Sequence, residues 1–205
     1  MMEKDRLTAF SDGVIAIIIT VMVLELKSPH GVEFAALRPV YRTLLLYVLS
    51  FVFVAIYWNN HHHLFHVVKR VDGRVLWANM HLLFWLSLTP FVMGWLGEAG
   101  LTPWPTAMYG VVLFMSGVAY YIMTRTLLRL HGPETRLARA LGADFKGRVS
   151  VMLYAAAIVL AFWQPLAAVA IYAMVAIIWL VPDTRMERAL RHPEGEPGGH
   201  GHTGD

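Results

Sequence analysis

The sequence predicts an all-α integral membrane protein with six transmembrane helices per subunit and both termini in the cytoplasm. Of its 205 residues, 57% are hydrophobic and only 15% are charged, whereas soluble domains carry about 25% charged residues. The mean hydropathy of +0.53 points to the same class. The apolar residues also gather into long runs, which is the third observation. This composition excludes an ordinary soluble domain and makes the lipid bilayer the first expected partner.

The lengths of the apolar runs predict the individual spans. A helix needs about 20 residues to cross roughly 30 Å of hydrocarbon. Four runs meet this requirement, at residues 8–26, 41–60, 75–96 and 106–124. The stretch from Phe145 to Pro182 is too long for one crossing and is interrupted by Gln164 and Pro165. Because proline removes a helix donor and disfavours helix in the preceding residue, we expect two spans joined by a tight turn there.

Basic residues predict the orientation, because cytoplasmic loops carry an excess of Lys and Arg. With six spans, only Lys27, Arg38 and Arg42 among the 17 Lys and Arg residues face outward. A five-span alternative moves the last three arginines outward and weakens this asymmetry. Six spans are therefore preferred. The basic clusters are explained as orientation signals, so no nucleic acid is expected as a partner.

The end of the chain differs from the rest. Residues 1–190 are expected to form one six-helix transmembrane domain. Residues 191–205 read RHPEGEPGGHGHTGD, which is rich in Gly and Pro and has no apolar periodicity, so a disordered tail is predicted. The chain contains no cysteine, which excludes disulfides, thiol nucleophiles and thiolate metal sites.

The first predicted helix carries a stripe of unusual composition. Its positions advance by alternating steps of four and three, so they share one helical face: Arg6, Phe10, Gly13, Ile17, Thr20 and Leu24. Gly13 permits close approach of another helix, and Thr20 places a hydroxyl at membrane depth. Simple helix packing explains such a face, because small and hydroxylated residues are common there. A pore lining also explains it, with apolar rings as constrictions and a hydroxyl ring that touches a passing ion.

Ionisable residues at membrane depth are costly, so Asp12 needs a partner. The predicted topology brings Arg6, Ser11 and Asp12 to the depth of two polar stretches, YWNNHHHLFH at the end of the second span and WANMHLLFW at the start of the third. We expect a network of hydrogen bonds and ion pairs at this level. The groups expected at this depth also include Trp58, Asn59, His61, His63, His66 and His81, and the residues predicted as the structural site are Arg6, Phe10, Ser11, Asp12, His62 and Asn79.

The histidines also raise the possibility of a metal site, because His62 and His66 lie four residues apart on one helical face. A hydrolytic zinc site of this spacing would place a glutamate beside the first histidine, and this stretch has none. The sequence also shows no carboxylate pair, Gly-rich phosphate loop or activated serine. We therefore expect no metal, no cofactor and no enzyme activity, and a structural or proton-sensing role for the histidines.

Several of these stretches together resemble the transmembrane protein 175 family of potassium channels. The signature is Arg6, three residues, then Phe10-Ser11-Asp12, continuing into GVIAIIITVMVLEL. WNNHHHLF and NMHLLFWLSLTPF extend the resemblance through the second and third spans. Animal members carry two six-span repeats and form dimers, so the resemblance implies that this one-repeat chain forms a homotetramer in a prokaryotic plasma membrane.

The resemblance also implies the function and its residues. In this family the first helices line the pore, and the resemblance puts Ile17 at the main constriction and Thr20 at a position that contributes to selectivity. Leu24, which lies on the same stripe, is expected to form a further constriction. The expected function is a potassium-preferring channel for K⁺ and other monovalent cations. The carbonyl-lined filter of ordinary potassium channels is absent, so selectivity should be modest. The alternative is a proton- or cation-coupled secondary transporter, although the sequence shows neither the mid-membrane helix breaks nor the internal symmetry typical of that class.

Overall fold

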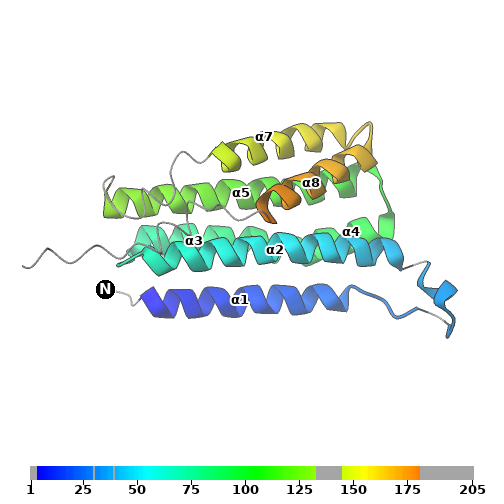
Figure 1. Ribbon diagram of the computed structural model, residues 1–205, viewed down its shortest axis with the longest axis horizontal. Coiled ribbons are helices and arrows are strands. Elements are labelled where there is room, and N and C mark those ends of the chain that lie inside the picture. The colour runs from blue at the N-terminus through cyan, green and yellow to red at the C-terminus, as the bar shows by residue number, and fades with distance from the viewer. Residues whose placement is uncertain (1–3, 30, 39, 133–144, 181–205) are drawn as a thin grey trace, which may run out of the picture.

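The computed structural model is an all-helical bundle whose helices run along one long axis (Figure 1). The structure describes residues 4–29, 31–38, 40–132 and 145–180, so the predicted tail at 191–205 lies outside the described residues. The elements are α1 (Lys4–Leu24), the short 3-10 helix η1 (Phe34–Leu37), α2 (Tyr41–Val67), α3 (Gly73–Ser87), α4 (Thr89–Ala99), α5 (Pro103–His131), α7 (Phe145–Leu160) and α8 (Pro165–Leu180).

Within the described residues, four segments are long and apolar enough to cross a membrane: α1, α2, α5, and α3 together with α4. These are the four spans that the sequence predicts. The break between α7 and α8 also lies where it was predicted, with Pro165 as the first residue of α8. Each of these two helices has 16 residues, or about 24 Å at 1.5 Å per residue. Their crossing of the membrane stays a prediction.

The third span differs from the single helix that the sequence predicts. It is divided at Leu88 into α3 and α4. Pro90 lies in the first turn of α4 and has no amide hydrogen to donate to the carbonyl of Leu86, so the regular hydrogen-bond pattern stops there. The backbone amide of Leu88 instead bonds the carbonyl of Trp85 at 3.2 Å, a tighter turn. The span predicted at 75–96 is therefore present, with a local break at Leu88 that the apolar pattern did not indicate.

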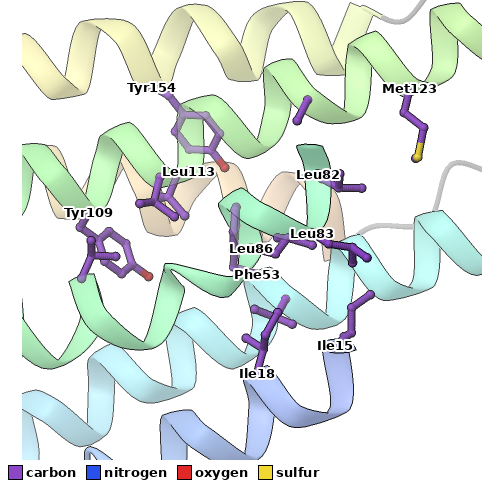
Figure 2. Close-up of a cluster of buried hydrophobic side chains, with 14 of the residues drawn as sticks. Ile15, Ile18, Phe53, Leu82, Leu83, Leu86, Tyr109, Leu113, Met123 and Tyr154 are labelled. Carbon is purple, nitrogen blue, oxygen red and sulfur yellow. The ribbon is translucent and has the colours of Figure 1, made fainter. Parts of the chain in front are cut away.

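The helices are arranged with α1 at one edge of the bundle and α7 at the opposite edge (Figure 1). α1 packs against α2, α3 and α4, whereas α5 packs against α3, α4, α7 and α8. Apolar side chains fill the space between these helices, and Figure 2 shows Ile15 and Ile18 directed from α1 toward Phe53 and Leu83. Gly110 of α5 permits a close approach to Tyr172 of α8, since a side chain at that position would collide with the tyrosine hydroxyl.

Candidate functional site

The first helix has two faces of different character. Its buried residues are Leu7, Ser11, Ile15, Ile18 and Met22, which are spaced by three or four positions. They form the contact with α2, α3 and α4. The opposite face holds the predicted stripe, and every one of its six members is exposed in the single subunit.

The exposed face is mostly apolar but carries isolated polar groups. Phe10, Ile17 and Leu24 are 54%, 63% and 79% exposed. Between the last two, the Thr20 hydroxyl donates a hydrogen bond to the carbonyl oxygen of Ile17 at 2.9 Å. This bond satisfies the hydroxyl hydrogen within the helix and leaves the oxygen lone pairs available outward. Ile17 and Leu24 are about 10 Å apart along the helix axis, because seven residues separate them.

The buried face carries a polar network toward the N-terminal end of α1. The Asn79 side-chain amide of α3 donates to the Ser11 hydroxyl oxygen at 2.9 Å, and Ser11 donates to the Leu7 carbonyl at 2.9 Å. The Asn79 carbonyl oxygen lies 2.9 Å from His61 Nε2 of α2. Ser11, His61 and Asn79 are each fully buried. A single asparagine therefore connects α1, α2 and α3 inside the bundle, where unpaired polar groups are costly.

The histidine in this network is His61, whereas the sequence analysis selected His62. One residue corresponds to a rotation of about 100° around a helix, so His62 points away from Asn79. His62 is exposed and stacks on Trp58, with 5.7 Å between ring centroids. The spacing of apolar neighbours contained a signal for His61, which lies three and four residues before the buried Leu64 and Phe65.

The two charges of the signature have different surroundings. Asp12 Oδ1 accepts a hydrogen bond from Trp58 Nε1 at 3.0 Å, so its partner lies on α2. Trp58 belongs to the YWNNHHHLFH stretch that the sequence analysis placed at the depth of Asp12. Arg6 is exposed on the stripe and makes no hydrogen bond or ion pair with any residue that the structure describes. The two charges do not pair with each other.

The other end of α1 is held by α4. The Lys27 ammonium pairs with the Glu98 carboxylate, and this hydrogen bond raises the pKa of Lys27. Gly94 of α4 packs closely against the side chain of Glu25, where a larger residue would collide. Both ends of α1 are thus fixed to neighbouring helices through polar contacts, while the predicted stripe between them stays uncovered.

The described residues bring together no group of three His, Asp or Glu side chains able to hold a metal. His62 and His66 are both exposed. α1 thus has a buried, mostly apolar face that polar contacts fix near its N-terminus, and an exposed, mostly apolar face that no described residue covers.

Comparison with known proteins assigns the chain to a family. A protein from Chryseobacterium sp. that is named as a potassium channel is 49% identical over 190 residues, covering 93% of this chain and 99% of the relative. A family model described as "Endosomal/lysosomal potassium channel TMEM175" matches residues 6–90. The chain belongs to the TMEM175 family. This finding confirms the resemblance derived from the signature, and the matched residues include Ser11, Asp12, Trp58, His61 and Asn79 of the polar contacts.

More distant TMEM175 proteins are similar over less of their sequence. A zebrafish protein named "Endosomal/lysosomal proton channel TMEM175" is 27% identical over 135 residues, which is 63% of this chain and 25% of the relative. The crystal structure of a Chamaesiphon minutus protein, described as a lysosomal potassium-selective channel TMEM175 homolog, superposes with a TM-score of 0.72 at 27% identity. It covers 86% of this chain and 96% of that one.

Proposed function

We propose that this chain is a potassium-preferring cation channel in which four copies surround a pore lined by α1. The observation that carries the proposal is the exposed stripe of α1, which lies opposite the face that anchors the helix. The Chryseobacterium relative, similar over almost its whole length, is named as a potassium channel.

In this arrangement Ile17 and Leu24 form two apolar rings with the Thr20 hydroxyls between them. Apolar rings narrow enough to exclude water stop ions without any charged gate. A ring of hydroxyl oxygens replaces part of the hydration shell of a passing cation, so Thr20 discriminates between K⁺ and Na⁺. No cofactor and no chemical step are needed, which separates this function from that of an enzyme.

The proposal includes a topology. Six crossings with both termini in the cytoplasm place the polar network at the cytoplasmic end of α1 and the Lys27–Glu98 pair at the outer end. A bacterial relative of this similarity makes the prokaryotic plasma membrane the proposed location. The outer side then carries few basic residues, in agreement with the orientation rule.

The deciding experiment is single-channel recording of the purified protein in a planar bilayer with K⁺ on one side and Na⁺ on the other. Unitary currents that reverse toward the K⁺ equilibrium potential are expected. Transport without unitary steps would instead indicate the alternative, a coupled secondary transporter. The mass of the detergent-solubilised assembly, corrected for bound detergent, should correspond to four chains.

Proton conduction is a second candidate, and it is favoured by the name of the zebrafish relative. The same recordings with a pH gradient and symmetrical K⁺ distinguish the two. A reversal potential that follows the pH gradient would make protons the main permeant ion, whereas a reversal potential near zero supports K⁺.

A further inference from the structure

A cavity of about 480 Å³ lies between α2, α5, α7 and α8, away from the α1 stripe. Its floor includes the buried side chains of Phe53, Tyr154 and Ala176. Its mouth includes Tyr121, Arg148 and Met152, all exposed. The volume falls within the range of small-molecule sites, about 300–1,000 Å³. Nothing in the proposed ion pathway uses this cavity.

Two polar groups of the cavity wall, the Ser150 hydroxyl and the backbone carbonyl of Asn60, already have partners within the protein. The Ser150 hydroxyl donates to the carbonyl of Lys146 at 2.8 Å and accepts from Trp179 Nε1 at 2.8 Å. The backbone carbonyl of Asn60 accepts from the Tyr120 hydroxyl at 3.4 Å. An ordered water needs two to four polar partners, so the largely apolar floor offers poor sites for water. An apolar occupant suits this space better.

Among the described residues that line the cavity, Arg148 at the mouth is the one charged side chain. Arg148 makes no hydrogen bond or ion pair with any residue that the structure describes, and no described Asp or Glu lines the cavity. A guanidinium group binds phosphate in a two-pronged geometry. The cavity therefore combines an apolar interior with a free phosphate-binding group at its opening.

The position of the mouth fits access from the bilayer. α7, which carries Arg148 and Met152, lies at the edge of the bundle opposite α1 (Figure 1). If α1 faces the centre of an assembly, α7 faces lipid. Arg148 is in the first turn of α7. α7 begins in the half of the bundle nearer the N-terminus of α1 (Figure 1), which the proposed topology places toward the cytoplasmic leaflet.

We propose that this cavity binds one anionic phospholipid of the inner leaflet, with one acyl chain between α2, α5, α7 and α8 and the phosphate at Arg148. Basic pockets between transmembrane helices on the cytoplasmic side are suited to anionic lipid headgroups. The lipid fills the space that Tyr154 and Phe53 line. It is a structural ligand of each subunit, independent of the permeant ion.

Native mass spectrometry of the delipidated assembly, titrated with phosphatidylglycerol or phosphatidylcholine, tests this proposal. The wild-type protein should bind one phosphatidylglycerol per subunit in preference to phosphatidylcholine. Arg148→Gln should weaken phosphatidylglycerol binding about tenfold or more, the loss expected for a charge-assisted contact. Arg129→Gln is the matched control, because Arg129 is exposed in the last turn of α5 and lies outside the cavity. It should leave the affinity unchanged.

Two further variants test the interior rather than the charge. Gly117→Leu on α5 and Ala176→Leu on α8 each fill the cavity from a different wall. Either variant that keeps the assembly mass of the wild type should lose the bound phospholipid. If Arg148→Gln and Arg129→Gln weaken phosphatidylglycerol binding equally, the preference comes from the overall surface charge and the proposal is overturned. Undiminished binding in both cavity-filled proteins, or displacement of the lipid by inorganic phosphate alone, would overturn it too.

Discussion

The two faces of α1 have nearly the same composition but different surroundings. Ile17 and Ile18 are neighbours in the sequence, yet the first is 63% exposed and the second is 4% exposed. Each face also carries a hydroxyl, Ser11 inside the bundle and Thr20 outside it. In a soluble protein, polarity would separate the two faces. In a membrane protein both can be apolar, so the difference lies in which polar groups have partners on other helices.

The largest expected effect concerns the buried face. Asn79→Ala removes the amide that connects Ser11 and His61, and each buried group left without a partner costs about 1–3 kcal/mol. We expect this variant to be recovered largely unfolded or aggregated. Asn59→Ala, which changes an exposed asparagine on α2, is the control and should behave as the wild type. Fluorescence-detected size exclusion measures how much of each variant is recovered as an intact assembly. An intact Asn79→Ala assembly would show that the network does not anchor α1.

Asparagine substitution at the paired isoleucines compares the two faces directly. Ile18→Asn buries an amide among apolar side chains and should lower the free energy of unfolding by about 1–3 kcal/mol. Ile17→Asn places a polar ring in the proposed constriction and should instead raise the resting conductance at near-wild-type stability. Thermal unfolding and bilayer recording separate the two outcomes. Similar conductance changes at both positions would contradict the assignment of Ile17 to the pore.

Replacing the two charged residues of the signature, Arg6 and Asp12, is expected to change stability and assembly less than the substitutions above. Asp12→Ala removes the hydrogen bond from Trp58 and should destabilise each subunit by about 0.5–1.5 kcal/mol, because Trp58 is partly exposed to solvent. Arg6→Ala should leave the subunit intact but reduce the tetramer peak, because Arg6 has no partner among the described residues of its own chain. Size exclusion with a melting curve tests both variants. Two stable tetramers with altered ion preference would place these charges in the permeation path.

The smallest effect is expected at Thr20. Thr20→Ala removes the hydroxyl between the two apolar rings and should lower the K⁺ to Na⁺ permeability ratio without closing the pore. Thr20→Ser is the matched control, since it keeps the hydroxyl, and it should preserve the ratio. Reversal potentials under bi-ionic conditions provide the measurement. An unchanged potential in the alanine variant would assign selectivity to another residue.

Much of the fold could be predicted from span length, because about 20 apolar residues have few alternatives to a membrane helix. The break at Leu88 was missed because Pro90 lies inside an otherwise continuous apolar run, and proline is tolerated in membrane helices. The turn before Pro165 was found because Gln164 precedes that proline. Hydropathy alone therefore identifies the spans but not the bends within them.

The candidate site could be predicted only in part, because the sequence pattern identifies a helical face but not what that face contacts. A stripe of three- and four-residue steps gave one face of α1, but periodicity did not show whether that face lies against another helix. The choice between His61 and His62 required knowledge of which side of α2 meets α3. That side depends on tertiary packing, although the buried Leu64 and Phe65 indicated it locally.

The division of the third span has a mechanical consequence for α1. α3 holds the N-terminal half of α1 through Asn79 and Ser11, whereas α4 holds its far end through the Glu98 pair with Lys27. The two holding helices meet at the single residue Leu88, where the regular backbone hydrogen bonds are interrupted. Because α1 contacts both helices, a change in the angle between α3 and α4 would tilt α1. A rotation at Leu88 would move Ile17 and Leu24 by different amounts, because they lie at different distances along α1.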